Sequence, residues 1–275
     1  MRANTLREIW AKGEAVVNGW ASIPTAFSAE VMAHQGYDSN TVDMQHGVVD
    51  YQAMVNMLTA ISTTSVIPLA RVPWNDPAII GKTWDAGVYG IICPMVNTPE
   101  QAEALVQASK YPPRGFRSNG PVRASLYGGS DYWKHANDTL LCIPMIETAE
   151  AVKNIDAILS VPGVEAIYVG PADLSWSLGC MPPRLDQTDA PVVEAQKTIV
   201  KACKKHGVFA GIHCATSAYA SKMIEEGYQL VTLGLSNFAH LLVVIYTYRE
   251  PDVIRVISAW KANHHQEQAY EKGRR

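Results

Sequence analysis

The sequence predicts a single α/β domain folded as a (β/α)8 TIM barrel. Short apolar, β-rich segments recur along most of the 275 residues and alternate with amphipathic segments, the order expected when helices join the strands of a parallel sheet. Most of the strand-like segments are apolar throughout, as strands covered on both faces are. The length also fits, because such barrels fold as single units of roughly 250 residues.

Eight segments have the composition of strands, and eight such units favour a closed barrel over an open sheet. In chain order they are Val16–Trp20, Ser39–Met44, Val66–Val72, Gly87–Pro94, Leu140–Ile146, Ala166–Gly170, Phe209–His213 and Leu230–Gly234. The helical segments between them include Asp50–Ile61, Thr98–Ser109, Thr148–Leu159, Ala190–His206 and Ser217–Glu226. Glycines at 163, 207 and 227 stand between helix ends and the strands that follow, which supports these boundaries.

Two regions depart from this alternation. The Gly/Pro-rich segment 111–129 comes after the fourth strand, and we expect it over the carboxyl-end face, since loops of this length are commonly functional or mobile. Past the eighth strand, residues 238–248 and 251–263 are expected to form two helices, the second with an apolar stripe. That stripe needs cover from its own barrel or from a neighbouring subunit. The polar tail 264–275 is expected to fray.

Charge and composition exclude several kinds of partner. A net charge of −3 and a pI near 6.2 give no basic surface for nucleic acid or for an anionic membrane, which favours a small-molecule partner. No signal-like apolar region opens the chain, and no uncharged apolar run reaches ~18 residues. The five cysteines form no C-x-x-C pair, which favours a reducing compartment. We therefore expect a soluble cytoplasmic protein.

Two acidic residues follow predicted strands. Glu147 comes directly after the fifth strand, and Asp173 comes shortly after the sixth. The carboxyl ends of barrel strands meet at one face, where this fold places its active sites. Carboxylate oxygens suit magnesium or manganese and suit zinc or copper poorly, so the pair predicts a divalent metal site that a 2-oxo acid can chelate. Either acid alone also fits the first turn of a helix.

Three more candidates end the second and third strands. Asp43 and His46 lie three residues apart, so a bond from the Asp43 carboxylate to one ring nitrogen would make the other nitrogen of His46 a better general base. Arg71 ends a largely apolar strand and can stabilise an enolate oxygen with its rigid guanidinium. The structural alternatives are that His46 caps a turn and that Arg71 forms an ion pair with Asp43 or Asp85.

Two weaker signals concern substrate binding. The turn from Gly170 into helix-like sequence is expected to point backbone N–H groups at a bound carboxylate, which would make an anion site without a basic side chain. His213 ends the seventh strand and is a candidate pocket residue, whereas other single histidines have no consistent partner.

The order and spacing of several motifs resemble the HpcH/HpaI family of class II 2-oxo acid aldolases over nearly the whole chain. The motifs are Asp43-x-x-His46-Gly47, Arg71, Pro94-Met95-Val96, Tyr111-Pro112-Pro113-x-Gly115, Ile146-Glu147-Thr148 and Gly170-Pro171-Ala172-Asp173-Leu174-x-x-x-Leu178-Gly179. Members of this family include 4-hydroxy-2-oxoheptanedioate aldolase and 2-dehydro-3-deoxyglucarate aldolase.

The resemblance implies a barrel of the phosphoenolpyruvate/pyruvate superfamily and a metal-dependent lyase. Its reaction would be reversible cleavage of a 4-hydroxy-2-oxo acid to pyruvate, or hydroxypyruvate, and an aldehyde, through a metal-bound enolate. Glu147 and Asp173 would bind the Mg²⁺, Mn²⁺ or Co²⁺ ion. The family also implies a homohexamer built as a dimer of trimers, with the C-terminal helix exchanged between subunits.

Carried over by position, the resemblance also implies roles for the other candidates. Arg71 would bind the keto or enolate oxygen, and His46 with Asp43 would form the base dyad acting through a metal-bound water. Asp85 would help to hold the dyad or Arg71, and the Ala172 amide would contact the substrate carboxylate.

Three departures from the family pattern bear on substrate choice. Gln45 stands where many members have glutamate, Trp176 stands where a small residue is common, and Gly211–Cys214 replaces a more apolar strand ending. Trp176 and His213 are therefore expected to help shape the pocket, as are Trp74 and the segment 111–129.

Two rival functions remain at this point. A lyase of the same superfamily acting on coenzyme A thioesters would need a basic groove, for which only Arg114, Arg117 and Arg123 in the long segment are candidates. A non-catalytic binder of 2-oxo acids would have no use for a base dyad.

Overall fold

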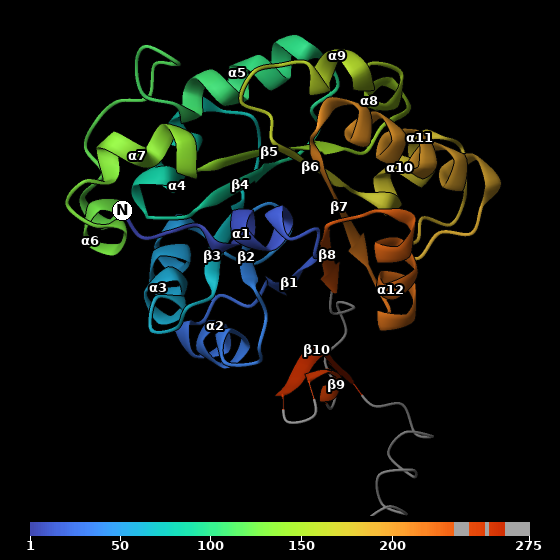
Figure 1. Ribbon diagram of the computed structural model, residues 1–275, viewed down its shortest axis with the longest axis horizontal. Helices are drawn as coiled ribbons and strands as arrows, with labels where there is room; N and C mark the ends of the chain where they lie inside the picture. Colours follow the sequence, from blue (N-terminus) through green and yellow to red (C-terminus); the bar gives the residue numbers. More distant parts are fainter. Residues whose placement is uncertain (234–241, 251–252, 262–275) are drawn as a thin grey trace, which may run out of the picture.

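The centre of the protein is a closed barrel of eight parallel strands. A computed structural model describes residues 1–233, 242–250 and 253–261 (Figure 1). The strands pair in sequential order, and β1 pairs with β8 to close the ring. They are β1 Val16–Ala21, β2 Ser39–Asp43, β3 Ile67–Arg71, β4 Gly90–Cys93, β5 Leu141–Ile146, β6 Ala166–Val169, β7 Phe209–Cys214 and β8 Leu230–Leu233. The predicted barrel and its eight strands are confirmed.

Helices surround the strands and bury their outer faces (Figure 1). They are α1 Thr5–Ala11, α2 Ala26–Ala33, α3 Tyr51–Ile61, α4 Pro77–Asp85, α5 Pro99–Ser109, α6 Val122–Gly128, α7 Tyr132–Thr139, α8 Ala149–Lys153, α9 Ile155–Leu159, α10 Pro171–Ser177, α11 Ala190–His206 and α12 Ser217–Glu226. None of the described helices is long and apolar enough to cross a membrane.

Side-chain caps set where several helices begin. Asp50 accepts a hydrogen bond from the Ala53 N–H, and Thr98 forms a capping box with Gln101. These caps satisfy donors that the first helical turn leaves free. Because the caps follow soon after strand ends, the connections at the carboxyl-end face are short and the residues that end the strands converge there.

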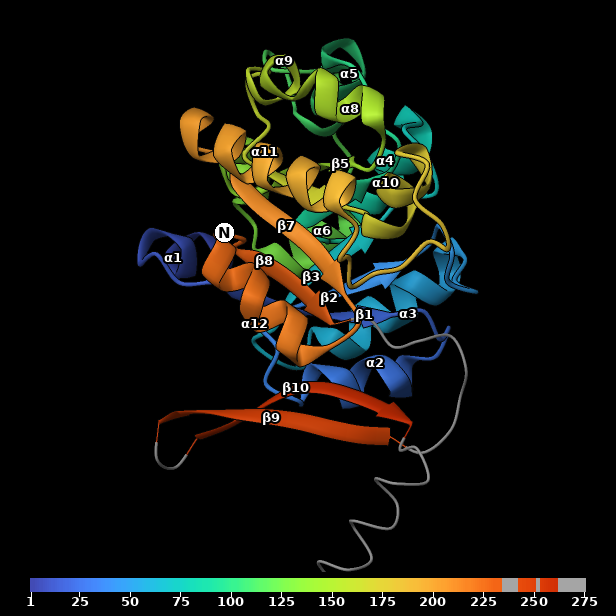
Figure 2. The same cartoon turned by 90° about the vertical axis from the view of Figure 1, so that its right-hand side faces the viewer.

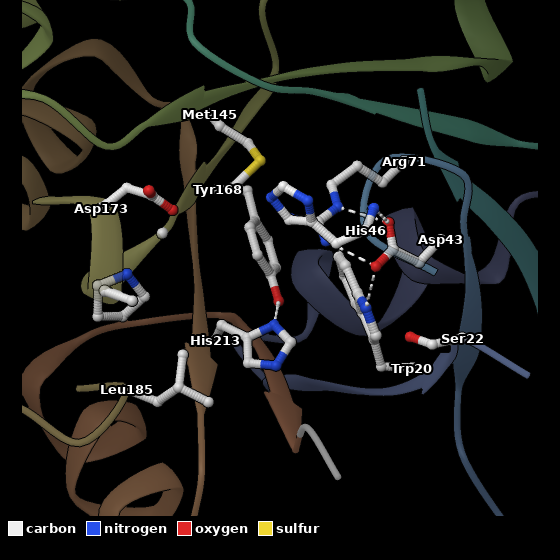
Figure 3. Close-up of a pocket in the computed structure, with 13 residues that line it drawn as sticks. Trp20, Ser22, Asp43, His46, Arg71, Met145, Tyr168, Asp173, Leu185 and His213 are labelled. Carbon is white, nitrogen blue, oxygen red and sulfur yellow. Dashed lines mark hydrogen bonds and ion pairs between the residues drawn. The ribbon is translucent and has the colours of Figure 1, made fainter. Parts of the chain in front are cut away.

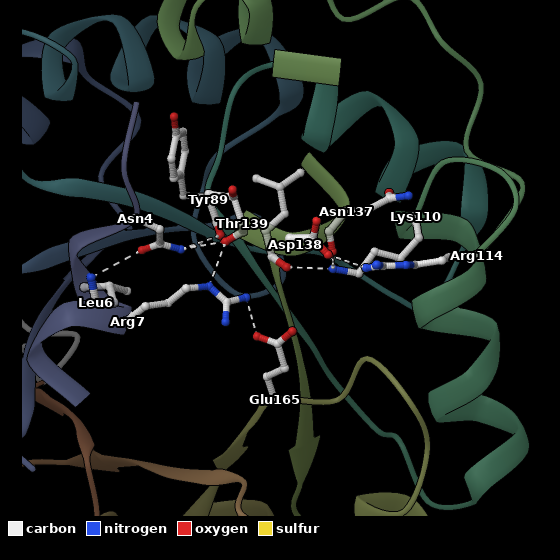
Figure 4. A network of polar contacts seen from close by, with 11 residues as sticks. Asn4, Leu6, Arg7, Tyr89, Lys110, Arg114, Asn137, Asp138, Thr139 and Glu165 are labelled. Carbon is white, nitrogen blue, oxygen red and sulfur yellow. Dashed lines mark hydrogen bonds and ion pairs between the residues drawn. The ribbon is translucent and has the colours of Figure 1, made fainter. Parts of the chain in front are cut away.

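The amino-end face of the barrel is closed by side chains (Figure 4). Asn4, which caps α1, donates from Nδ2 to the Thr139 carbonyl at 3.0 Å, and Arg7 forms an ion pair with Glu165. Trp10 stacks on Phe209 with ring centroids 4.3 Å apart. This packing leaves the opposite, carboxyl-end face for the polar pocket described below.

The segment 111–129 lies at the amino-end face, so its expected position over the active face is wrong. It follows α5, which returns the chain from the carboxyl ends of the strands to their amino ends, and the segment includes α6. Arg117 donates to Asp85 at 2.8 Å at the end of α4, and Arg123 donates to the Ala86 carbonyl. A connection from a helix to the next strand must lie where that strand begins.

The prediction of two C-terminal helices is also wrong over the described residues. The chain there forms an antiparallel pair, β9 Leu242–Glu250 and β10 Val253–Lys261, and Figure 2 shows the pair outside the ring of barrel strands. Both segments are rich in β-branched and aromatic residues, which favour strands, and a short apolar run does not by itself separate helix from strand. Residues 238–241, 251–252, 262–263 and the tail 264–275 lie outside the described residues.

Candidate active site

A pocket of about 320 Å³ opens among the residues that end the barrel strands (Figure 3). It brings together residues from six strands or the loops that follow them. The lining residues are Trp20, Ser22, Asp43, His46, Arg71, Met145, Tyr168, Gly170, Pro171, Ala172, Asp173, Leu185 and His213. Most of the candidates named from the sequence therefore meet in one place.

Arg71 is held rigidly by Asp43. The two residues are register partners on β2 and β3, and Arg71 donates from Nε to Oδ1 at 2.8 Å and from Nη2 to Oδ2 at 2.6 Å. Trp20 donates to Oδ2 at 3.2 Å, and the Arg71 guanidinium carbon lies 4.8 Å from the Trp20 ring centre. Burial raises the pKa of Asp43, but the hydrogen bonds and charge of Arg71 outweigh burial and hold that pKa below its ordinary value.

The expected bond between Asp43 and the His46 ring is not formed. Asp43 Oδ1 instead accepts from the backbone N–H groups of Gln45 and His46, at 3.1 and 3.3 Å. The tight turn depends on Gly47, because a Cβ there would overlap the Asp43 carbonyl. In the described part of the chain no hydrogen bond orients the His46 imidazole, which lines the pocket beside Arg71 (Figure 3).

Glu147 lies just behind the pocket wall with only 3% of its surface exposed. Its Oε1 accepts from the Met95 N–H at 2.7 Å, and Met95 has φ +57°, a left-handed conformation that only this residue adopts among the described non-glycine residues. Burial raises the pKa of Glu147 to about 7; the Met95 bond lowers it and the negative charge of Asp173 raises it further. Gly170 covers the carboxylate so closely that a Cβ there would overlap Oε2.

Glu147 and Asp173 fit a divalent cation by their chemistry. Asp173 lies in the first turn of α10 and lines the pocket, and within the described ranges neither acid belongs to an ion pair. Two neighbouring carboxylates without a cationic partner supply hard oxygen ligands. Residues 1–233 contain no group of three His, Cys, Asp or Glu side chains placed to hold a metal, so a cation there would complete its coordination with other oxygens.

His213 lies at another edge of the pocket and is bonded to Tyr168. Its Nδ1 is 3.0 Å from the Tyr168 hydroxyl, and its ring meets Trp20 edge-on with centroids 4.8 Å apart. Burial, reinforced by the positive charge of Arg71, lowers the pKa of His213 to about 3, although Asp43 opposes the shift. His213 is therefore uncharged at neutral pH.

Comparison with known proteins places this geometry in a family. Residues 19–241 match the family described as HpcH/HpaI aldolase/citrate lyase. The chain belongs to this family. It is thus a carbon–carbon lyase of the aldolase class, as predicted from the sequence.

Relatives in the HpcH/HpaI family are similar over most of their length. The chain is 41% identical over 229 residues to a hydroxypyruvate/pyruvate aldolase of Rhizorhabdus wittichii, covering 83% of this chain and 91% of the relative. It is 32% identical over 238 residues to a 4-hydroxy-2-oxo-heptane-1,7-dioate aldolase of Escherichia coli, covering 85% and 89%. A crystal structure of a family protein from Burkholderia cenocepacia superposes with a TM-score of 0.78 at 32% identity, covering 84% and 92%.

Besides Glu147, which lies behind the pocket wall, two predicted site residues do not line the pocket of this HpcH/HpaI family member. Asp85 ends α4 at the amino-end face, where it pairs with Arg117, so within its own chain it does not hold Arg71 or His46. Trp176 has 62% of its surface exposed on α10 and is absent from the pocket lining. Arg114 pairs with Asp138, so the arginines weighed for a coenzyme A groove lie away from the pocket.

Sequence reasoning missed Trp20 and Tyr168. Both lie within predicted strands, and neither was named as a site candidate. The position of Trp20 in the sequence could have identified it as a site residue. It ends the first predicted strand at the active face, and Arg71 lies in the same way near the end of the third. Tyr168 gave no comparable signal, since it lies in an otherwise apolar strand.

Proposed function

We propose that this aldolase cleaves 4-hydroxy-2-oxo acids reversibly to pyruvate or hydroxypyruvate and an aldehyde, and that it needs a divalent cation. The carrying observation is that Asp173 in the pocket and Glu147 just behind its wall lack a cationic partner among the described residues and share the carboxyl-end face with a rigidly held guanidinium. The names of the relatives, a hydroxypyruvate/pyruvate aldolase and a 4-hydroxy-2-oxo-heptane-1,7-dioate aldolase, support a 2-oxo acid as substrate.

Glu147 and Asp173 would hold the cation, with magnesium, manganese or cobalt as candidates. When bound, the cation would supply Lewis-acid polarisation of the substrate carbonyl. The Met95 N–H fixes one Glu147 oxygen and leaves the other toward Gly170 and the pocket wall. Ala172 lines the pocket beside Asp173, and its backbone N–H would bind the substrate carboxylate.

Arg71 would stabilise the negative charge that develops on the substrate oxygen. Asp43 occupies Nε and Nη2, which leaves the Nη1 hydrogens for a substrate oxygen. Because Asp43 and Trp20 already fix the guanidinium, little reorganisation is needed when the charge appears. The Asp43–Arg71 ion pair, which was the structural alternative to a catalytic role, would therefore position Arg71 for catalysis.

His46 is the candidate base for the C4 hydroxyl proton during cleavage. It lines the pocket beside Arg71, and its backbone N–H is anchored by Asp43. Removal of that proton would let C4 become the aldehyde carbonyl as the C3–C4 bond breaks, and the bonding electron pair would pass to the 2-oxo oxygen, where Arg71 would stabilise the negative charge.

The proposal is tested by measuring pyruvate release from 4-hydroxy-2-oxo acids. We expect activity to vanish in chelator, to return with Mg²⁺, Mn²⁺ or Co²⁺, and to be lost in Glu147→Gln and Asp173→Asn. Glu150→Gln is the matched control, because Glu150 is an exposed acid in the first turn of α8. Full chelator-resistant activity would contradict the metal assignment. Cleavage of a coenzyme A thioester in place of the oxo acids would contradict the substrate class, and binding without turnover would favour a non-catalytic role.

The resemblance to the family supports a homohexamer, which we propose as the assembled state. Large apolar side chains lie exposed on the connections and the first turn of α2 at the carboxyl-end face, as expected where another subunit packs, and they include Ile23, Phe27, Val48 and Trp74. Native mass spectrometry should find six copies of the 30.1 kDa chain, and a monomer at micromolar concentration would contradict this. The five free cysteines support a reducing cytoplasmic location.

A further inference from the structure

A line of hydrogen bonds crosses the barrel interior and ends at His213. It begins at Asn18 on β1, which is fully buried. The hydroxyls of Ser39 and Thr41 donate to Asn18 Oδ1 at 2.8 and 3.0 Å, and Asn18 Nδ2 donates to Thr232 Oγ1 at 2.8 Å. An amide nitrogen can only donate, so this first step has a fixed direction.

The hydroxyl groups of Thr232 and Tyr168 continue the line of hydrogen bonds toward His213. Since Thr232 accepts from Asn18, its own hydrogen is free to donate to the Tyr168 hydroxyl, with which Thr232 also forms a hydrogen bond. The Tyr168 hydrogen is then directed to His213 Nδ1, 3.0 Å away. In this arrangement each group accepts a hydrogen bond on one side and donates one on the other, and Tyr168 donates to His213.

The neighbouring strands leave space for the side chains that form this line of hydrogen bonds. Tyr168 is fully buried, and its register partner on β7 is Gly211, where a Cβ would lie 3.0 Å from Tyr168 Cδ2. His213 and Thr232 are also register partners, on β7 and β8. The tyrosine therefore reaches across the barrel because a glycine stands beside it.

A hydrogen bond donated by Tyr168 selects a single neutral tautomer of His213. An imidazole whose Nδ1 accepts a hydrogen bond carries its proton on Nε2 when it is neutral. Figure 3 shows the ring at the pocket edge near Leu185 and Trp20, with Nδ1 turned to Tyr168. Nε2–H is then an uncharged donor on the part of the ring that Tyr168 leaves free, in a side chain that lines the pocket.

The surroundings decide which ligand oxygen this donor suits. A second carboxylate would need a further positive charge beside it, but the charge of Arg71 is already balanced by Asp43, and His213 stays neutral because burial and Arg71 disfavour its charged form. An uncharged hydroxyl oxygen needs only a neutral donor. His213 therefore suits a substrate hydroxyl better than a second carboxylate.

We propose that His213, fixed as its Nε2–H tautomer by Tyr168, is a specificity residue that donates a hydrogen bond to a substrate hydroxyl. The hydroxyl can come from C3 of hydroxypyruvate or from a hydroxyaldehyde. This inference rests on the proposed aldolase function and adds to it the chemical group that the pocket selects.

The test compares substrates that differ by one hydroxyl. The donors are pyruvate and hydroxypyruvate, and the acceptors are acetaldehyde and glycolaldehyde. In His213→Leu, the kcat/KM ratio of the hydroxylated to the deoxy substrate should fall by about 3- to 10-fold in the donor arm or the acceptor arm, as expected for one neutral hydrogen bond. The affected arm identifies the source of the hydroxyl. His213→Gln, which keeps an N–H donor, should retain the ratio.

The controls separate a specificity role from a structural one. A purely structural His213 would lower all four activities together, and unchanged ratios in His213→Leu would overturn the inference. Tyr168→Phe keeps His213 and removes its directing hydrogen, so it should give a smaller fall in the same ratio. A wild-type enzyme inactive with all four pairs would refute the proposed function instead.

The tautomer of His213 can also be measured directly in the wild-type protein, so that this test does not depend on the folding of a variant. Two-bond ¹H–¹⁵N NMR correlations distinguish the two neutral tautomers of histidine. We expect His213 to be the Nε2–H form at neutral pH. A protonated Nδ1 would overturn the inference whatever the kinetics show.

Discussion

Replacing Gly170 by alanine tests whether Glu147 is a metal ligand without touching either carboxylate. Gly170 has φ −96° and ψ 91°, an extended conformation that alanine also adopts, so backbone strain does not enter. An added Cβ would overlap Glu147 Oε2 and would lie 3.0 Å from Met145 Cε and 3.1 Å from Glu147 Cβ. The Met145 methyl can move aside, but the Glu147 carboxylate must retreat by about 1 Å to reach ordinary contact distance.

That displacement sets the expected magnitude. Disturbing the groups that orient a metal ligand typically weakens metal binding by roughly 10- to 100-fold, and we expect this range for Gly170→Ala. Isothermal titration with Mn²⁺ measures the affinity, and thermal unfolding checks that the variant is folded. Gly81→Ala is the matched control, because nothing lies within 4 Å of the added Cβ. Placed inside α4, that alanine should stabilise the protein by about 0.5–1 kcal/mol. A folded Gly170→Ala protein that binds Mn²⁺ as tightly as wild type would refute the assignment of Glu147.

Other predictions follow from the same contacts. Metal affinity should fall about tenfold per pH unit as the pH drops below about 7, because only the deprotonated Glu147 carboxylate binds metal. Burial and the charge of Asp173 raise the pKa of Glu147 to about 7. Metal titrations at several pH values measure this dependence. Asp43→Asn should lower the free energy of unfolding by about 3–5 kcal/mol in urea denaturation at neutral pH, since it leaves the largely buried Arg71 charge without its partner. This difference should shrink in acid, because the stabilisation from an acid with a lowered pKa is lost as the pH falls through that pKa. Arg71→Lys should reduce kcat by roughly 10²–10³-fold with little change in metal affinity, and a wild-type kcat would remove Arg71 from the reaction.

The strands and the residues that end them were predictable from the sequence because local rules decide both. Apolar, β-rich runs that alternate with amphipathic segments give the barrel, and the carboxyl ends of parallel strands share one face. Arg71, Glu147, Asp173 and His46 could therefore be assigned to one face before any contact was known. The same alternation of strands and helices also determines where segment 111–129 lies. Our prediction for this segment was wrong, because the preceding helix 99–109 returns the chain to the amino-end face.

Which group each of these residues contacts was decided only by the tertiary structure. Asp43 and His46 are close in sequence, yet Asp43 binds Arg71, its register partner on the next strand. Asp85 pairs with Arg117 at the far end of the barrel, 32 residues away in sequence. Hydrogen-bond partners follow from strand register and side-chain direction, and neither quantity is carried by residue type or spacing alone.

The sequence by itself thus determined the fold class, the active face and the aldolase family of this protein. The tertiary structure decided that Asp43 fixes Arg71, that Gly170 covers Glu147, and that the Tyr168 hydroxyl meets His213 Nδ1. The physical reason is that apolar periodicity is a local property of the chain, whereas these contacts join strands distant in sequence and exist only once the barrel closes.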